Sequence, residues 1–354
     1  MKKEKSKIAI DKIILGNFVV QEIKDIEKLE MAGIVSVEKK AEHYAIDNLN
    51  NQYNNIHIRN SQFFDDFYYG RNKLSGNYYG KLEISVYGKS NHNLDGWTID
   101  ELKNHIEKIQ KYLEEMGIIV DFQFLKIKRI ELNKTIMLEN ECCNYHRVLK
   151  QIIKLLPKNL QKTQYIYNDD ENNYTYYSGS STTEVKIYNK TGQLEKAFNI
   201  LLEDNYLRFE IVLSGYETII NNLKTNLLSE ITQEEINNYF ISFINNNVIK
   251  THDVWIEKSQ KYIIKIIKQK LKVRNTWDEV IESILSDELS NEIPLLLDYE
   301  NLINLLDKIK FKNKQSKYKA KKRIKEIVIK NAPILNQNDT KKYIEIIEKL
   351  VNER

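Results

Sequence analysis

Cysteine, proline and glycine are scarce in this 354-residue sequence, which contains two, three and eleven of them respectively. The two cysteines, Cys142 and Cys143, are adjacent, so they cannot form an ordinary structural disulfide with each other. Because there is no second cysteine pair, the sequence also lacks the ligand set of a structural zinc site. These absences predict a chain of regular helices and strands that folds in a reducing compartment.

Long hydrophobic runs are also missing. No stretch approaches the roughly 18 uncharged apolar residues that a membrane-spanning helix needs. The N-terminal segment MKKEKSKIAIDKIILGNF begins with basic residues, but Asp11 and Lys12 interrupt its apolar run and it has no small-residue cleavage site. We therefore expect a cytoplasmic protein.

The charge is nearly balanced overall but is unevenly distributed. The chain has 54 basic and 50 acidic residues, for a net charge of +4. Between residues 308 and 331 there are ten lysines and one arginine against a single acid, Glu326. Such a cluster is typical of a surface that binds phosphate backbones, although a solvated helix face in a lysine-rich protein is an equally good interpretation. The candidate nucleic-acid-binding residues here are Lys314, Lys317, Lys319, Lys321, Lys322 and Arg323.

The spacing of apolar residues divides the chain into two parts. Residues 1–248 mix strand and helix patterns, whereas residues 249–354 have apolar residues at three-to-four spacing, which is typical of helices. We predict a first domain over 1–248 and an all-helical C-terminal domain over 249–354, with Trp255 and Trp277 as core residues. The helical part is expected to bind DNA or a partner protein.

Four segments of the first part alternate apolar and polar residues, as half-buried strands do: 81–87, 124–132, 184–190 and 207–213. Helices are predicted over 98–118, 144–156 and 192–203. The first of these begins with Thr98 and Glu101 in the spacing of a capping box and stops near Gly117. The predicted fold class is α+β, an antiparallel or mixed sheet with helices on one face, followed by the helical C-terminal region.

Alternation along these strands sorts their side chains onto two faces. If the apolar stripes face the helices, one polar residue from each strand points to the open face: Glu83, Glu131, Tyr188 and Glu210. Clustered carboxylates repel one another, and a divalent cation offsets that repulsion, so the pattern predicts a magnesium or manganese site beside a phenol. The simpler alternative is that these glutamates mark the solvent side of an amphipathic sheet.

Local motifs add information to this pattern. Four short blocks occur in order between about residues 78 and 215: KLEIS followed by YGKSNHNL and a helix, then KIKRIELN, YSGSSTTEVKIYNK and LRFEIVL. Together they resemble the replication initiators of filamentous phages, the gene II protein family, and the related initiators of small rolling-circle plasmids. The resemblance implies a nicking core that starts rolling-circle DNA replication of a plasmid or phage.

The resemblance also implies roles for individual residues. Tyr188 matches the tyrosine that becomes covalently joined to the nicked strand, and Lys190 would favour its phenolate form. The acids of the first, second and fourth blocks fall on Glu83, Glu131 and Glu210, which implies metal binding. Arg129 and Arg208 would contact the scissile phosphate or form structural ion pairs with these acids. The chain departs from the family at Gln193, where a glutamate is usual, and this leaves open whether a carboxylate from that turn joins the site.

The six histidines are scattered, with no His-x-His pair of the kind that marks the histidine-using nicking enzymes. His92 lies in the loop after the first motif strand, where an exposed histidine is a simpler interpretation than a metal ligand. The sequence also has no GxxxxGK[ST] loop, no CxxC pair and no GxSxG motif, so ATPase, zinc-finger and hydrolase functions lose support.

The resulting hypothesis is a metal-dependent tyrosine endonuclease that nicks and religates origin DNA, presented as a hairpin or single strand. Unpaired bases could stack on aromatic residues of the segment 167–177. Expected partners are duplex origin DNA, a host helicase and polymerase, and a second subunit. Three alternatives stay open: a non-catalytic origin-binding protein of the same descent, an interaction protein with a similar sheet, and a tyrosine recombinase, for which no Arg, His, Arg set is recognisable.

Overall fold

The structure is a computed structural model that describes residues 7–38, 55–59, 61–70, 83–87, 94, 96–168, 174–272, 279–280, 299–311, 313–330 and 339–352. The positions expected for His92 and Trp277 lie outside these residues, as does most of the YGKSNHNL motif.

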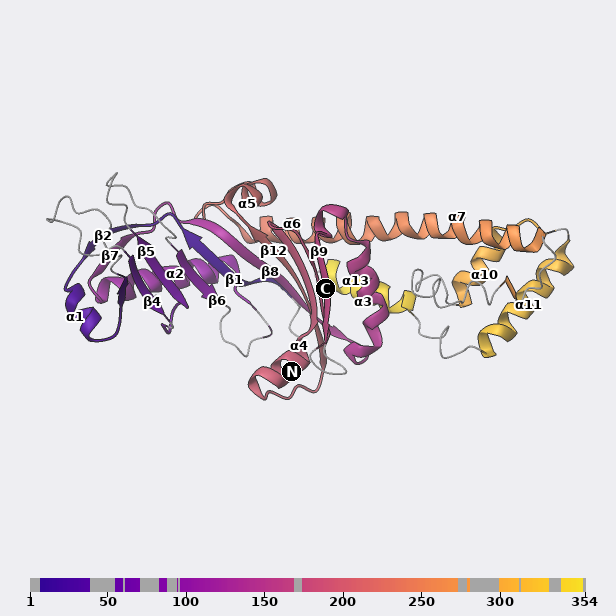
Figure 1. The fold of residues 1–354 in the computed structure, drawn as a ribbon, viewed down its shortest axis with the longest axis horizontal. Helices are drawn as coiled ribbons and strands as arrows, with labels where there is room; N and C mark the ends of the chain where they lie inside the picture. Colours follow the sequence, from indigo (N-terminus) through magenta and orange to yellow (C-terminus); the bar gives the residue numbers. More distant parts are fainter. Residues whose placement is uncertain are drawn as a thin grey trace.

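The core of the molecule is a twisted antiparallel sheet (Figure 1). In its described part it has ten strands in the order β3-β4-β5-β6-β1-β8-β12-β11-β10-β9. Their bounds are β1 Ile8–Gly16, β3 Ser36–Glu38, β4 Asn55–Arg59, β5 Asp66–Gly70, β6 Glu83–Tyr87, β8 Lys126–Leu138, β9 Thr163–Asn168, β10 Tyr174–Gly179, β11 Thr183–Asn189 and β12 Asn205–Ser214. A separate antiparallel pair joins β2 (Val19–Ile23) and β7 (Ile118–Asp121).

The described helices are α1 Ile26–Met31, α2 Ile99–Glu115, α3 His146–Leu155, α4 Lys190–Phe198, α5 Tyr216–Leu223, α6 Gln233–Ile244, α7 Lys250–Lys272, α10 Tyr299–Asp307, α11 Lys314–Lys330 and α13 Asp339–Val351. Short helical turns occur at η1 Cys142–Tyr145, η2 Lys158–Leu160 and η3 Asn245–Ile249. The predicted α+β class, with a sheet, helices and a helical C-terminal region, is confirmed.

The four predicted strands correspond to β6, β8, β11 and β12. The helix predicted over 98–118 is α2, and its capping box is present: Glu101 N–H donates to Thr98 Oγ1, and Thr98 N–H donates to Glu101 Oε2. The helix ends before Gly117, which adopts a φ of +83° that favours glycine. The third predicted helix starts two residues earlier, because Asn189 caps α4 at its Gly192 N–H.

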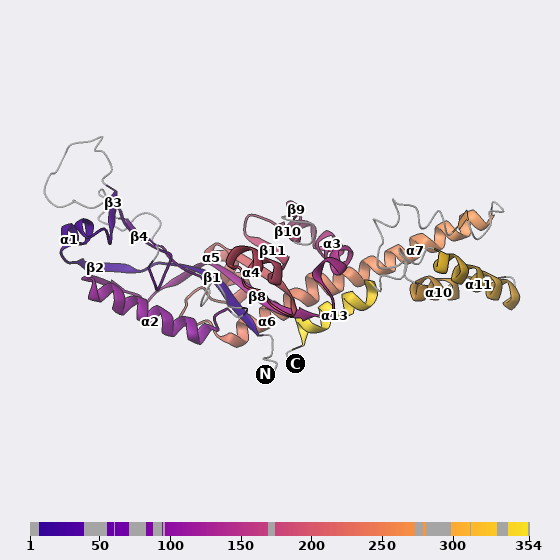
Figure 2. The same cartoon turned by 90° about the horizontal axis from the view of Figure 1, so that it is seen from below.

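Buried aliphatic residues of the central strands face α2 and α6, which run along one side of the sheet (Figure 2). The opposite face carries the polar residues. One helix departs from the predicted arrangement with helices on one face, because α4 borders this polar face and lines the cavity there with Gly192 and Gln193.

Two β-bulges interrupt the alternation of the central strands. In β1 the pairing with β8 shifts between Ile10 and Lys12, so Asp11 is an extra residue and turns to the polar face. A second shift between Ile14 and Leu15 leaves Lys128 of β8 as the extra residue. This bulge explains why apolar and basic residues mix in the sequence 124–132.

The C-terminal helices begin as a direct continuation of the sheet domain. Helix α6, the π-turn η3 and helix α7 follow one another without a break from Gln233 to Lys272. Figure 1 shows α7 extending away from the sheet towards α10 and α11. Trp255 of α7 packs against the core, as predicted. The boundary between residues 248 and 249 stays a prediction, and the structure places it inside this continuous helical segment.

The last described helix, α13, returns to the sheet and packs on β8, α3 and α6. Its C-terminal end meets a buried lysine of β8: Lys134 Nζ donates to the carbonyls of Leu350 and Asn352, each at 3.0 Å. A cation at the C-terminal end of a helix satisfies free carbonyls and interacts favourably with the helix dipole. The burial of Lys134 therefore depends on α13.

Helix α13 also contacts α7 through a ring pair. His252 is buried and stacks on Tyr343, with ring centroids 3.8 Å apart. Burial lowers the pKa of His252 from 6.5 to about 4. The unfolded chain therefore takes up a proton at His252 near pH 6.5, whereas the folded chain does so only near pH 4. The contribution of neutral His252 to stability is present above pH 6.5 and is lost as the pH falls towards 4.

We expect His252→Phe, which keeps the ring and removes the titration, to flatten this dependence. Urea unfolding at pH 7 and pH 5 measures it as the difference in the free energy of unfolding. The fall between the two pH values should be smaller in His252→Phe than in the original protein. Equal falls in both would contradict this account of His252.

Among the helices of the described residues, none is long and apolar enough to cross a membrane.

Candidate nicking site

A cavity of about 610 Å³ lies on the polar face of the sheet, between β11, β12 and α4. Its lining residues are Asp11, Glu131, Tyr174, Thr175, Lys186, Tyr188, Asn189, Gly192, Gln193, Lys196, Ala197 and Glu210. Strand pairing explains this gathering, because directly opposite residues of an antiparallel pair share a face. Tyr188 lies opposite Arg208, and Lys186 lies opposite Glu210.

The closest polar contact in the cavity joins Tyr188 to Glu210. The phenol donates a hydrogen bond of 2.5 Å to Glu210 Oε1. Burial and the negative charge of Glu210 raise the pKa of Tyr188 well above its usual range, although the Arg208 guanidinium acts in the opposite direction. Burial and the nearby charge of Asp11 likewise raise the pKa of Glu210. The phenol therefore holds the shared proton and points it at the carboxylate.

Lys186 lies between Glu131 and Glu210, two of the three acids that line the cavity. Its Nζ is 4.0 Å from Glu131 Oε2 and 3.9 Å from Glu210 Oε2. Two carboxylates from neighbouring strands thus converge on one cation. Among the described residues, no group of three or more His, Cys, Asp or Glu side chains is arranged to hold a metal ion.

Arg208 is fully buried beside Tyr188, and its guanidinium is committed to internal partners. Its Nη1 donates to Asp11 Oδ1 at 2.8 Å, its Nε to Thr135 Oγ1 at 2.9 Å and its Nη2 to the Leu94 carbonyl at 2.7 Å. The sequence left two roles open for Arg208, contact with the scissile phosphate or a structural ion pair. The geometry favours the structural ion pair.

Lys190 is the first residue of α4, so it does not continue the strand face as the sequence pattern suggested. Its Nζ still reaches the site and lies 5.9 Å from the centroid of the Tyr188 ring. It donates a 2.8 Å hydrogen bond to Gln193 Oε1. Burial, followed by repulsion from Arg208, lowers the pKa of Lys190 to about 8. Gln193, the departure from the family pattern, is therefore the neutral partner of a buried lysine.

Arg129 is half-buried and is not one of the residues that line the cavity. Its Nε donates to Glu131 Oε1 at 3.0 Å, and its Nη1 contacts Ser214 Oγ at 3.3 Å and Glu184 Oε1 at 3.5 Å. It thereby fixes one oxygen of Glu131 and leaves the other towards Lys186.

Glu83 is the one predicted acid that does not line the cavity. Lys128, the bulged residue of β8, binds it at 2.6 Å. Glu83 lies four residues before Tyr87 in β6. Tyr87 pairs with Lys12 of β1, and Lys12 in turn pairs with Glu131 of β8. At about 3.3 Å per residue, Glu83 is displaced by about 13 Å along the sheet from the level of Glu131.

Sequence reasoning did not single out Asp11 or Lys186 as site residues, although both line the cavity. The signal for Lys186 was present, because it shares the strand face of Tyr188 in β11. Asp11 was noticed only as an interruption of an apolar run. The two adjacent charges Asp11 and Lys12 break the alternation of this strand, and the β-bulge lies at the same place.

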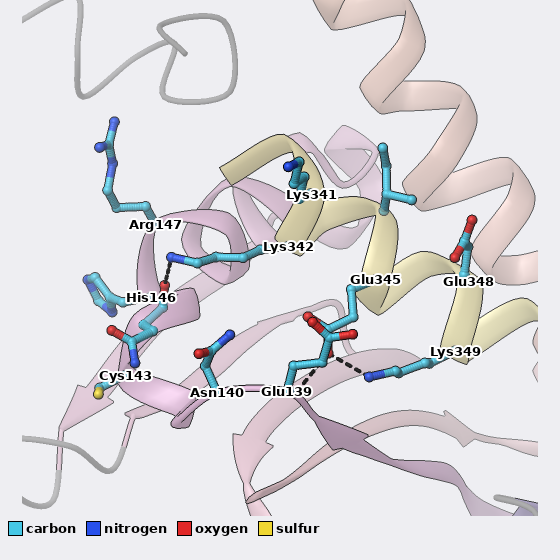
Figure 3. A pocket seen from close by; sticks show the side chains of 12 residues that line it. Glu139, Asn140, Cys143, His146, Arg147, Lys341, Lys342, Glu345, Glu348 and Lys349 are labelled. Atoms are coloured by element: carbon cyan, nitrogen blue, oxygen red, sulfur yellow. Dashed lines mark hydrogen bonds and ion pairs between the residues drawn. The ribbon is translucent and has the colours of Figure 1, made fainter. Parts of the chain in front are cut away.

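A larger cavity of about 900 Å³ lies elsewhere, between α13 and the η1–α3 segment. Figure 3 shows both acidic and basic side chains around it, with Arg147, Lys341 and Lys342 in the upper part and Glu139, Glu345, Glu348 and Lys349 below and to the right. Lys349 Nζ binds Glu345 at 2.6 Å, and Lys342 Nζ donates to the Asn144 carbonyl at 2.7 Å. None of the candidate nicking residues lines this cavity, and its paired charges make it part of the docking of α13.

The basic cluster falls on α11, which pairs with α10. Lys317 and Lys321 each approach Asp307 of α10 to 2.8 Å, and Arg323 pairs with Glu326. Lys314, Lys319 and Lys322 are exposed. Of the six predicted residues, Lys317, Lys321 and Arg323 thus have acidic partners, and Arg323 is exposed as well.

Comparisons with known proteins add little to this geometry. No model of a known protein family matches the chain, and no curated protein matches it. Among solved structures, a rolling circle replication initiator protein from Geobacillus stearothermophilus is similar, with 11% sequence identity and a TM-score of 0.36. The match covers 68% of this chain and 85% of that protein. A TM-score this low carries no argument, so the function must be argued from the site itself.

Proposed function

We propose that this protein initiates rolling-circle replication by nicking one strand of origin DNA with Tyr188. The observation that carries the proposal is the 2.5 Å hydrogen bond from the Tyr188 phenol to Glu210, inside an open cavity that also holds Glu131 and Lys186. A phenol bound to a carboxylate is an oxygen nucleophile beside a proton acceptor. The order of the four sequence motifs supports the same function.

In the proposed reaction Tyr188 Oη attacks the phosphorus of a phosphodiester, and the bond from phosphorus to the 3′-oxygen breaks. The phenol proton passes to Glu210 Oε1, and the leaving 3′-oxygen takes a proton from water. The 5′-phosphate stays esterified to Tyr188, which conserves the bond energy for religation. Positive charge from Arg208 and Lys190 beside the ring favours the phenolate that forms.

We also propose that Glu131 and Glu210 hold a Mg²⁺ or Mn²⁺ ion. The donor set fits, because carboxylate oxygens of two adjacent strands already converge on a cation, the ammonium of Lys186. Glu210 can serve both purposes, since Oε1 accepts from Tyr188 while Oε2 faces Lys186. When bound, the ion supplies a Lewis acid for the phosphate.

DNA outside the nick site would contact α11 through its exposed lysines. We expect Lys319→Ala with Lys322→Ala to weaken binding to duplex DNA and to reduce the slope of log affinity against log salt by about 0.9 for each lost phosphate contact. The matched variant, Lys317→Ala with Lys321→Ala, removes two lysines that share the carboxylate of Asp307, which offsets one of their two charges, and should change the slope less. Fluorescence anisotropy over a salt series measures both. A slope in Lys319→Ala with Lys322→Ala that equals that of the original protein would exclude α11 as the contact surface.

The released 3′-hydroxyl would prime a host polymerase. The extended helical part beyond Lys250 would recruit a helicase or a second subunit.

The test is to incubate the full chain with supercoiled DNA of its own replicon and magnesium or manganese. The expected product is an open circle with protein attached to a 5′ end. A nick without attached protein would contradict the tyrosine mechanism, and intact DNA with either metal would contradict the proposed function.

A further inference from the structure

Two stacked tyrosines occupy the polar face beside the candidate nicking site. Tyr165 of β9 and Tyr177 of β10 lie directly opposite each other, with ring centroids 4.5 Å apart and ring planes 12° apart. Tyr165 is 51% exposed. Tyr177 is half-buried beneath it. A partly exposed pair of aromatic rings on the polar side of a sheet contributes little to the core and offers a flat surface to solvent.

The tyrosine pair lies beside the residues of the proposed reaction. Tyr177 is directly opposite Lys186, the residue that contacts both Glu131 and Glu210. Tyr188 is the next residue of β11 on the same face, so Tyr177 and Tyr188 are diagonal neighbours at about 7–8 Å. A group stacked on Tyr165 and Tyr177 would therefore lie close to a phosphate at Tyr188.

The backbone leaves room for this arrangement. A Cβ atom at Gly179 would lie 2.9 Å from Tyr177 Oη, so the phenol extends over a residue that has no side chain. Tyr176, the residue before Tyr177 in β10, faces the other side of the sheet, where it is buried and hydrogen-bonded to His146. The structure thus separates one core tyrosine from two surface tyrosines in the aromatic segments of β9 and β10.

We propose that Tyr165 and Tyr177 form a stacking platform for an unpaired nucleobase of the DNA strand whose phosphate reaches Tyr188. This inference rests on the proposed function. Bases have flat π-faces that stack on aromatic side chains with little dependence on sequence, and they are accessible only where the strand is unpaired. The platform would therefore select single-stranded DNA over duplex at the nick site.

The test is the affinity of the full chain for a fluorescein-labelled oligodeoxythymidylate of about 20 nucleotides, measured by anisotropy in EDTA at about 50 mM salt. We expect Tyr165→Ala with Tyr177→Ala to bind it about 10-fold more weakly, and Tyr165→Phe with Tyr177→Phe to stay within about twofold of the original protein. Affinity for a duplex of the same length should not change. The platform is excluded by three results: no loss in the alanine pair, an equal loss in the phenylalanine pair, or a parallel loss of duplex binding.

Should the alanine pair fail to fold, Tyr165→Ala alone decides the question, because Tyr165 is exposed and its replacement leaves the core intact. Unchanged single-strand affinity in that variant overturns the proposal. The outcome is separate from that of the nicking assay. Unchanged single-strand affinity in the alanine variants, with normal nicking by the original protein, would refute only the platform, whereas reduced affinity in the alanine variants of a chain that never nicks would refute only the proposed reaction.

Discussion

Replacing Tyr188 with phenylalanine is expected to abolish the covalent DNA adduct and to reduce nicking by at least about 10³-fold, because the variant lacks the attacking oxygen. The ring still fills the same space on β11, so the fold and the affinity for origin DNA should be retained. The measurement is the fraction of a radiolabelled origin oligonucleotide that migrates with the protein under denaturing conditions.

The matched control for this variant is Tyr206→Phe. Tyr206 lies on the adjacent strand β12, and its hydroxyl contacts Asp204 at 3.3 Å, outside the cavity. It should form the adduct at the normal rate. If Tyr188→Phe nicked normally, the nucleophile would be another group. If neither Tyr188→Phe nor Tyr206→Phe nicked the DNA but both bound the origin, the chain would be a non-catalytic origin-binding protein.

The second large effect is expected from Glu210→Gln. The glutamine can still accept the hydrogen bond from Tyr188, but it cannot take the proton and binds a divalent cation poorly. Loss of a general base typically costs about 10²- to 10⁴-fold in rate, and we expect a decrease in nicking in that range. Single-turnover nicking of supercoiled DNA measures it, with binding followed separately.

The variants Glu131→Gln and Glu83→Gln test separately whether each of these two acids contributes to the cation site. Glu131 shares Lys186 with Glu210, so its replacement should raise the concentration of magnesium or manganese needed for half-maximal nicking. Glu83 is held by Lys128 outside the cavity, and its replacement should leave nicking within about threefold of normal. A metal requirement that is unchanged in Glu131→Gln would remove Glu131 from the cation site.

Much of the sheet could be predicted from the sequence because its central strands alternate regularly. Over residues 185–187 of β11 and 207–213 of β12 every second residue is apolar, and this placed Tyr188 and Glu210 on one face, as observed. The same reasoning worked less well for β8, where the extra residue Lys128 shifts the alternation. Alternation also cannot give the position of a residue along its neighbours, so it could not show that Glu83 lies about 13 Å from the level of Glu131.

The other differences at the site have local physical causes. The bulge at Asp11 changes the register of β1 between Ile10 and Ile13, which both face the core, so one uninterrupted alternation cannot describe this strand. Lys190 comes from a helix instead of a strand because the Asn189 side chain caps the next turn. Helical periodicity found the C-terminal helices, but it carried no information on where α13 would pack.

Strand β8 exposes Glu131 to the polar cavity and turns Lys134 the other way, to carbonyl groups 216 and 218 positions later in the chain. Contacts over so long a separation form late, because the intervening polypeptide must first be ordered. During translation Glu131 therefore emerges from the ribosome long before α13, the helix that packs on β8. The packing of α13 behind β8 is complete only when synthesis has passed Asn352.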